Sequence, residues 1–542
     1  MAPTLWILGV SLGAAVVSER VIPASNGQSH YARTAVVLAI VQVLAWIAWR
    51  VVIWPKLFSP LRRLPTPPGA HYFLGHGRII LQKASGEPMR EWIDTVPNDG
   101  LIYYLNWLNM ERVLLTNPNT LAEVLTLKNY EFIKPAHFRT VLGRILGVGV
   151  LLAEGDEHKR QRKNLMPAFA FRHIRDLCPL FWTKSVEMIE GISEAITQPA
   201  IDAEKSSNII EAGDWSSRAT LDIIGLAGMG QDFGAIKDPS NKLSRTYKAV
   251  FTPPRSARIL GIIGLFVPIW LLQRLPIKRN QELSEASEVI KQTCRDSITT
   301  KKAKMESGEK SELDILSVAL ESGGFTDEDL VSQMMTFLAA GHETTSSAFT
   351  WTLYYLCKYP EVQKKMREEI RQVLPSPRAS RDQVTAKDLD NCRYINAVCN
   401  EVLRVMPPVS LTMRVAANDA TINGQLIPKD TTVVVAPYAV NTSAPLWGHD
   451  SKEFKPERWL APGQAGKGGA ESNYSFLTFL HGPRSCIGQA FSKLELVALL
   501  GAFVGRFEAE FRDEGFEAEI QGGITSRPKG GLWLKVKDTG DW

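Results

Sequence analysis

A loop near the C-terminal end carries one cysteine among residues that suit a negatively charged sulfur. It runs from Phe479 to Gly488 and reads Phe-Leu-His-Gly-Pro-Arg-Ser-Cys-Ile-Gly. Its glycines allow turns or close approaches that a side chain would block, and its proline stiffens the turn. Backbone N–H groups and the start of the next helix favour negative charge, so we expect Cys486 to be a thiolate. Arg484 adds a cation that suits a carboxylate on whatever the sulfur binds. The alternative is a structural cysteine buried in a turn.

A second chemical stretch lies in the middle of a long apolar helix that the pattern predicts over Thr326–Cys357. The stretch is Ala339–Thr345, in which an acid, Glu343, stands beside an alcohol, Thr344. Small residues such as Gly341 let a bulky planar group approach the helix backbone, and a glycine there costs about 1 kcal/mol against alanine. The alternative is a threonine bonded back to its own helix and an acid on the polar side.

A third group consists of opposite charges on an apolar helix. Glu401 and Arg404 are three residues apart just before Pro407 ends the helix. On most helices this spacing gives a surface pair worth a few tenths of a kcal/mol. Apolar neighbours indicate that this pair is buried instead, and Arg458, farther along the chain, is a candidate third member.

The cysteine loop has the spacing Phe-x-x-Gly-x-Arg-x-Cys-x-Gly and resembles the haem-binding loop of the cytochromes P450. The resemblance implies that Cys486 is the proximal ligand of the iron of haem b. It also implies that Phe479, Arg484 and Gly488 bind the cofactor, with Phe479 packed under the haem and Arg484 at a haem propionate. A thiolate ligand pushes electron density onto iron, so the implied chemistry is activation of O2.

The other two groups resemble further parts of the same family, in the same order along the chain. The Ala339–Thr345 stretch resembles the oxygen groove of helix I, which implies that Thr344 holds oxygen and its water and that Glu343 relays protons. Glu401, Arg404 and Arg458 resemble the buried network that supports the haem-bearing face.

Three more basic residues match propionate-binding positions of the family. The charged helix start at residues 155–163 resembles helix C, where Arg162 matches and His158 stands where a tryptophan is usual. A histidine can still donate to a carboxylate. From charge alone this helix start would be a solvated face. Arg414, at the start of a predicted strand, matches another propionate-binding arginine.

These residues imply a mainly α fold with small β-sheets, the cytochrome P450 fold, over residues 70–542. A proline-rich hinge precedes it at 60–69 and a membrane anchor at 1–59. The anchor contains two apolar segments, 2–17 and 34–54, of which the second has the length that a bilayer requires. It is therefore a transmembrane helix or a helical hairpin, and the alternative for 2–17 is a signal peptide.

Charge and composition place the catalytic domain in a reducing compartment. Lys56, Arg62 and Arg63 follow the second apolar segment, which puts the downstream chain in the cytosol by the positive-inside rule. The six cysteines show no Cys-x-x-Cys spacing, and the net charge of +5 does not suggest nucleic acid. A further apolar run, Leu260–Leu272, is too short to span. The run alone is equally typical of a core helix, and by its position it resembles the family's lipid-dipping F–G region.

The predicted function is that of a haem-thiolate monooxygenase of the endoplasmic reticulum membrane that oxidises a lipophilic small molecule, such as a terpenoid or polyketide of secondary metabolism. O2 is the co-substrate. The sequence has no Gly-x-Gly-x-x-Gly fingerprint, so the electrons come from a separate NADPH–cytochrome P450 reductase, with cytochrome b5 as a further candidate partner. The alternatives are a haem-thiolate isomerase or dehydratase that needs no reductase, and a non-enzymatic haem sensor. The Glu343–Thr344 pair argues against both.

Overall fold

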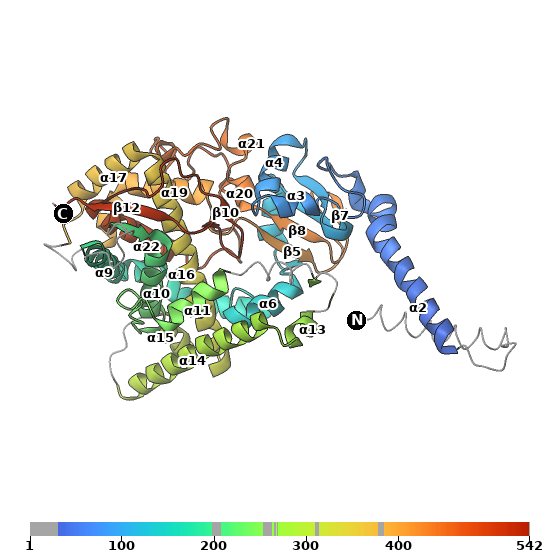
Figure 1. Cartoon of the computed structure of the whole chain (residues 1–542), viewed down its shortest axis with the longest axis horizontal. Helices are drawn as coiled ribbons and strands as arrows, with labels where there is room; N and C mark the ends of the chain where they lie inside the picture. The colour runs from blue at the N-terminus through green and yellow to red at the C-terminus, as the bar shows by residue number, and fades with distance from the viewer. Residues whose placement is uncertain are drawn as a thin grey trace.

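The computed structural model describes residues 31–197, 208–252, 263–264, 267, 269–308, 314–377, 384–540 and 542. These residues form a mainly helical body with four small sheets, which confirms the predicted fold class. Figure 1 shows the helices gathered at one end of the body and the largest sheet at the other end, from which α2 projects.

The helices vary from single turns to the long α14 and α16. The α-helices are α2 (Tyr31–Ala48), α3 (Gly77–Gln82), α4 (Glu87–Thr95), α5 (Pro118–Ala122), α6 (Ala136–Leu146), α7 (Gly155–Leu165), α8 (Phe171–Asp176), α9 (Cys178–Thr197), α10 (Ala212–Met229), α11 (Lys242–Phe251), α13 (Ile269–Arg274), α14 (Lys278–Glu306), α15 (Ile315–Glu321), α16 (Asp327–Lys358), α17 (Pro360–Val373), α18 (Ala386–Asn391), α19 (Arg393–Val405), α20 (Pro437–Val440), α21 (Ala444–Trp447) and α22 (Gln489–Arg506). The 3-10 or π segments are η1 (Trp49–Phe58), η2 (Pro60–Arg63), η3 (Trp107–Asn109), η4 (Glu123–Leu127), η5 (Met166–Phe169), η6 (Pro456–Trp459) and η7 (Asn473–Ser475).

The largest sheet has the order β1-β2-β8-β5-β3, and β2 and β8 are its parallel pair. A second sheet has the order β4-β12-β9, and β6-β7 and β10-β11 are two-stranded pairs. The strands are β1 (Leu101–Leu105), β2 (Glu111–Leu115), β3 (Phe132–Ile133), β4 (Ile209–Glu211), β5 (Thr412–Ala416), β6 (Ala420–Ile422), β7 (Gln425–Ile427), β8 (Thr432–Val435), β9 (Phe507–Phe511), β10 (Ile520–Gln521), β11 (Arg527–Pro528) and β12 (Trp533–Asp538).

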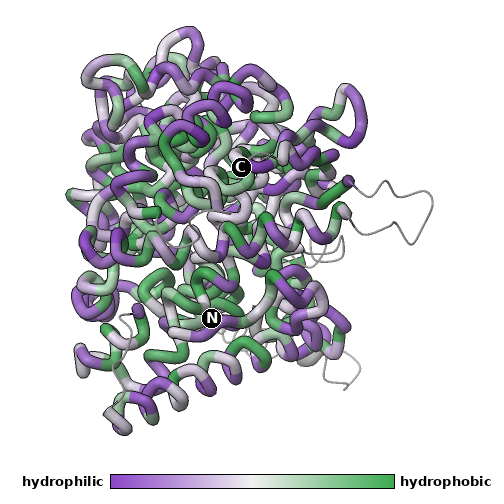
Figure 2. The backbone as a smooth tube through the Cα atoms, turned by 90° about the vertical axis from the view of Figure 1, so that its left-hand side faces the viewer, coloured by the Kyte–Doolittle hydropathy of each residue, from purple (hydrophilic) through white to green (hydrophobic). Residues whose placement is uncertain are grey.

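The long central helix forms where the apolar pattern predicts it. A capping box starts α16, because the Thr326 side chain accepts from the Asp329 N–H and the Asp329 side chain accepts from the Thr326 N–H. The helix is buried along most of its length and packs against α10 and α22 within the main core. Figure 2 shows hydrophobic segments running through the interior of the molecule and hydrophilic ones at its outer turns.

One helix of the described residues is long and apolar enough to cross a membrane, Arg33–Phe58, which contains the predicted segment 34–54. The predicted segment 2–17 lies outside the described residues. Within Arg33–Phe58, α2 continues into η1, which is bonded to the largest sheet. The Trp54 indole of η1 donates to Glu111 at 2.9 Å, and the Tyr103 hydroxyl donates to the same carboxylate at 3.0 Å. The helix is therefore fixed to the sheet before the proline-rich segment begins.

Of the apolar run predicted at Leu260–Leu272, residues 260–262, 265, 266 and 268 lie outside the described part of the chain. Its end forms the short helix α13. The proline-rich residues 60–69 are held against the domain, because the Tyr103 N–H donates to Pro65 and the His76 side chain contacts the Pro67 carbonyl at 2.9 Å.

Candidate functional site

The cysteine loop is closed by its own backbone. The Cys486 N–H donates to the Phe479 carbonyl at 2.8 Å, and α22 begins three residues after the cysteine. Gly482 has a φ of +77°, and a Cβ there would lie 2.2 Å from the Leu125 carbonyl oxygen, so only glycine fits this turn. The Cys486 side chain is exposed, not buried as in the structural alternative.

Two expectations about this loop concern the group that it binds and stay predictions. A Cβ at Gly488 would meet protein only at 3.9 Å, from Phe169, so no crowding by the chain requires this glycine. The thiolate form of Cys486 is the form in which a metal binds sulfur.

Basic side chains from α7, from β5 and from the cysteine loop itself converge near Cys486. Arg162 on α7 donates to the Ser485 carbonyl at 2.7 Å, and Arg414 on β5 donates to the Met413 carbonyl at 2.8 Å. His158 is buried on α7, one turn before Arg162, and its Nδ1 lies 3.0 Å from the Tyr130 hydroxyl. Arg484 is ion-paired with Glu154. The structure thus brings together the four basic residues that the sequence placed at propionate positions.

The cluster includes residues that the motifs did not reveal. Lys134 lies among the four basic side chains, and Tyr130 and Glu154 contact them. Burial, followed by the neighbouring positive charges, lowers the pKa of Lys134 to about 7 and that of His158 to about 4. Burial and Arg484 lower the pKa of Arg414 to about 10. The Lys134-Pro135 dipeptide carried no spacing signal that could have identified it.

The residues present fit haem. The basic side chains outnumber Glu154, and the Arg484 Nε is buried without a hydrogen-bond partner among the described residues. A group with two carboxylates would offset this excess of positive charge and supply the missing acceptor. The accessible sulfur of Cys486 lies next to the same cluster, since it interacts with Arg162. The donor set therefore suits an iron porphyrin with two propionates.

The predicted acid and alcohol on α16 do not touch each other. The Thr344 hydroxyl is half-buried and donates to the Ala340 carbonyl at 2.9 Å, as in the alternative of a threonine bonded to its own helix. The Glu343 side chain is buried and points to the C-terminal strands, where Thr525 donates to it at 2.5 Å and the Arg527 Nε donates at 2.7 Å. Sequence adjacency suggested a direct pair, but neighbours on a helix diverge by about 100°.

The glycine of this stretch has a packing role that the sequence did not reveal. A Cβ at Gly341 would lie 2.8 Å from the Ile224 side chain of α10, so the glycine permits close packing of α10 on α16. The approach of a planar group to this stretch stays a prediction. His342, for which the sequence suggested no role, is buried against Tyr247 and Phe251 of α11.

The predicted support network is present and fully buried at its centre. Arg404 donates twice to Glu401, at 2.8 and 2.7 Å, and both side chains have no exposed surface. Arg458 donates to Glu401 at 2.9 Å from η6. Trp459 donates its indole N–H to Glu401 at 2.9 Å and was missed, although it directly follows Arg458. Arg404 also donates to the Asn441 carbonyl, so the network joins α19 to the loops around the cysteine.

Comparisons with known proteins agree with this geometry. A family model described as Cytochrome P450 matches residues 65–534. The chain is 45% identical to "Cytochrome P450 monooxygenase sphH" of Aspergillus fumigatus over 95% of each chain. It is 40% identical to "Cytochrome P450 monooxygenase ALT8" of Alternaria alternata, over 92% of this chain and 93% of the relative. It is 39% identical to "Cytochrome P450 monooxygenase FUM15" of Gibberella moniliformis over 91% of each.

Proposed function

The chain belongs to the cytochrome P450 family of monooxygenases, and from this premise we propose that it oxidises a lipophilic small molecule with O2 and two electrons from a separate NADPH-dependent reductase. The observation that carries the proposal is the exposed Cys486 beside a cluster of basic side chains that outnumber the acidic side chain paired with them. When bound there, a haem with a thiolate ligand supplies the activation of O2.

Each residue of the site then has a defined task. Cys486 would ligate the iron of haem b, with Phe479 packed under the ring and Gly488 leaving room beside the sulfur. Haem propionates would be held by His158, Arg162, Arg414, Arg484 and, in addition, Lys134. Glu401, Arg404 and Arg458 would hold the loops that carry these residues in place, since their network is buried and bonded to backbone carbonyls.

Proton delivery would use α16. The Thr344 hydroxyl donates its hydrogen to the Ala340 carbonyl, so the hydroxyl oxygen is free to accept a hydrogen bond from a water molecule in the groove. Glu343 is held by Arg527 and Thr525, so a proton would reach the groove from its carboxylate only through water or after these contacts open. Because the two side chains do not touch, we assign the relay to Glu343 and the ordering of water to Thr344.

Electrons would arrive on the face where α22 begins. A depression of about 450 Å³ lies there, and its lining includes Ile487, Gln489, Lys493 and Arg175. Ile487 directly follows the cysteine, so a partner in this depression would come close to the metal ligand. Arg175 is ion-paired with Asp390, which also lines the depression, so Lys493 leaves a net positive charge that suits an acidic partner such as NADPH–cytochrome P450 reductase or cytochrome b5.

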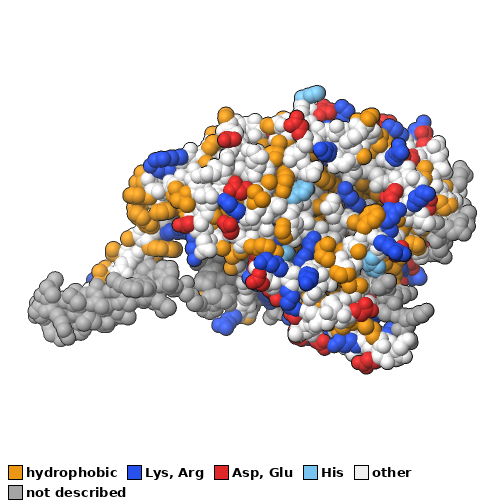
Figure 3. All heavy atoms as spheres, turned by 180° about the vertical axis from the view of Figure 1, so that it is seen from behind, with side chains coloured by type: hydrophobic (Ala, Val, Ile, Leu, Met, Phe, Trp, Pro, Cys, Tyr) orange, Lys and Arg blue, Asp and Glu red, His pale blue; other side chains and the backbone are white. Residues whose placement is uncertain are grey.

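Membrane attachment would place the catalytic domain beside a substrate that is dissolved in the lipid bilayer. The apolar helix Arg33–Phe58 is a candidate span that ends in the exposed residues Leu57 and Phe58, and beside it the domain exposes Tyr72 and Phe73, so that all four side chains are more than half accessible. Figure 3 shows hydrophobic side chains gathered where this helix joins the domain. This arrangement supports an endoplasmic reticulum protein with its domain facing the cytosol and drawing a lipophilic substrate from the bilayer.

The experiment is reconstitution in microsomes with reductase and a library of apolar compounds. We expect NADPH consumption that depends on a substrate, an oxygenated product, and loss of the thiolate signature of the CO-difference spectrum in Cys486→Ser. Product without reductase or NADPH would instead indicate an isomerase or dehydratase. Haem binding with no turnover under any condition would indicate a sensor.

A further inference from the structure

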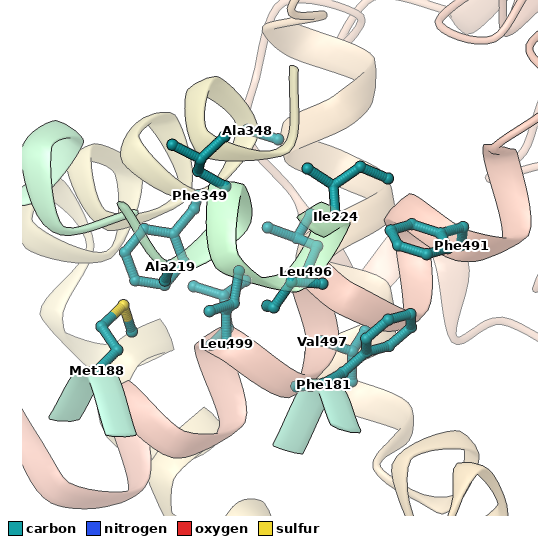
Figure 4. Close-up of a cluster of buried hydrophobic side chains, with 14 of the residues drawn as sticks. Phe181, Met188, Ala219, Ile224, Ala348, Phe349, Phe491, Leu496, Val497 and Leu499 are labelled. Carbon is teal, nitrogen blue, oxygen red and sulfur yellow. The ribbon is translucent and has the colours of Figure 1, made fainter. Parts of the chain in front are cut away.

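A buried acid without a formed hydrogen bond lies on the helix that follows the cysteine loop. The Glu495 side chain on α22 has no exposed surface, and neither of its carboxyl oxygens has a hydrogen-bond partner among the described residues. The helix that carries it is buried in the main hydrophobic core. Figure 4 shows its neighbours on α22, Leu496, Val497 and Leu499, packed among side chains of α9, α10 and α16. An ionised carboxylate is costly in such a place.

One polar side chain of the described core faces this acid. Thr345 on α16 lies close enough to the Glu495 carboxyl group to influence its pKa. The Thr345 hydroxyl is also buried without a formed hydrogen bond in the described structure. The two groups therefore lie near each other, and no hydrogen bond between them is formed in the described part of the chain. Burial raises the pKa of Glu495 well above its usual range, and Thr345 opposes this by less.

Charged groups on the elements that pack against α22 are engaged with other partners. Lys184 on α9 pairs with Glu187, and Arg175 on α8 pairs with Asp390. Asp388 on α18 accepts a hydrogen bond from Thr385, and Arg404 on α19 pairs with Glu401. Arg367 on α17 donates to the Val504 carbonyl, and Lys493 on α22 itself donates to Asn400. On β9, Glu508 and Glu510 are exposed, and on α16 the buried Glu343 is paired with Arg527. The thiols of Cys178 and Cys399 stay neutral, because burial raises the pKa of each to about 12.

We propose that Glu495 is a protonated carboxylic acid that donates a hydrogen bond to Thr345 and so links the helix of the cysteine ligand to the helix of the oxygen groove. Thr345 shares a peptide bond with Thr344, so the link fixes the position of the groove threonine relative to the cysteine loop. Glu495 is a positioning residue in this proposal, since it touches neither haem nor substrate.

The direction of the pH dependence follows from the proton. Above the ordinary pKa of a glutamate the unfolded chain releases this proton, whereas the folded protein keeps it. The stability that Glu495 contributes is therefore full at acid pH and falls as the pH rises, by at most tenfold in the unfolding constant per pH unit. Glu495→Gln should remove this part of the slope and leave the other titrations unchanged. An unchanged slope would contradict the protonated state.

The direct test is difference infrared spectroscopy of the full-length holoprotein at neutral pH, wild type minus Glu495→Gln. We expect the carbonyl stretch of a protonated carboxylic acid in the wild type, and a shift of that band to higher frequency in Thr345→Val, where the hydrogen bond is lost. A carboxylate band in its place would overturn the proposal, and a band unmoved by Thr345→Val would overturn the choice of partner. This test needs no reductase, so its outcome is separate from that of the proposed function.

The positioning role is tested by coupling. Glu495→Gln keeps a donor for Thr345 and should couple NADPH oxidation to product as the wild type does. Glu495→Leu and Thr345→Val should keep the thiolate CO spectrum but release several-fold more hydrogen peroxide per NADPH. Wild-type coupling in both would show that the link does not position the groove. If Glu495→Leu fails to fold, Thr345→Val, which changes volume little, still decides the question.

Discussion

Arg527 in the C-terminal strand β11 forms an ion pair with Glu343 in the middle of α16, and its Nε donates to Glu343 Oε1 at 2.7 Å. Thr525 donates to the same oxygen. The acid of the proposed proton path is thus held by a segment more than 180 residues away in the sequence. Its reach toward the groove is set by the C-terminal strands as well as by its own helix.

Replacing Glu343 with glutamine should slow proton delivery. The amide keeps the shape and can still bond Thr525, but it cannot accept and release a proton at neutral pH, so turnover should fall by about 10²-fold with a larger solvent isotope effect. The measurement is product formation in H2O and D2O with saturating reductase. Arg512→Gln, which removes an exposed arginine of the same C-terminal region, is the matched control and should leave both values unchanged. A wild-type isotope effect in Glu343→Gln would place the relay elsewhere.

Lys134 should make the stability of the haem-free protein depend on pH. Its folded pKa is lowered to about 7, while the unfolded chain keeps the ordinary value. Between these values the unfolded chain binds one more proton, so the stability should rise with pH above 7. Lys134→Met should flatten that rise in urea unfolding curves. Haem loading should also flatten it, because a propionate favours the charged lysine. A rise that survives in Lys134→Met would assign it to another group.

Breaking the buried network at Glu401 should destabilise the protein strongly. Arg404 is completely buried, and Glu401→Gln would leave it and Arg458 without their carboxylate, at a cost of about 3–5 kcal/mol in the free energy of unfolding. Haem retention during purification should fall with it. The control is Lys159→Ala, which removes an exposed pair with Asp156 and should leave the urea midpoint unchanged. Equal midpoints for the two variants would mean that the network is solvated.

The sequence predicted those parts of the site whose residues lie close together along the chain. It did not predict the contacts between residues that lie far apart. The cysteine loop, the extent of α16 and the Glu401–Arg404 pair are set by spacings within one element, and all were predicted. Arg527 and Lys134 come to the site only through tertiary packing, and no local pattern marks them. The packing role of Gly341 was missed for the same reason, because the side chain that would crowd a Cβ there is Ile224 on another helix.

Glu111 should hold the apolar N-terminal helix at a fixed angle to the domain. Its carboxylate accepts from both Trp54 and Tyr103, so Glu111→Ala leaves two donors unpaired at the junction, whereas Glu111→Gln retains one acceptor oxygen. Spin labels at the exposed positions Val41 and Lys429 would report the angle as a distance distribution in lipid nanodiscs. We expect a broad distribution for Glu111→Ala and a narrow one for the wild type. A narrow distribution in Glu111→Ala would show that packing alone fixes the helix.

Thr344→Ala separates a catalytic groove from a packing feature. The wild-type hydroxyl donates to the Ala340 carbonyl and keeps an acceptor free for water, so its loss should leave haem insertion, substrate binding and the thiolate CO spectrum intact. Protons should then reach reduced oxygen at the wrong place, and NADPH oxidation should continue while product falls and hydrogen peroxide rises. The matched control is Thr352→Ala on the same helix. Thr352 makes the same kind of bond, to the Ala348 carbonyl at 2.7 Å, two turns beyond the groove. This control should lose some stability and keep full coupling. If Thr344→Ala also kept full coupling, the hydroxyl would serve only to cap a turn of α16, and the assignment of water to this residue would be wrong.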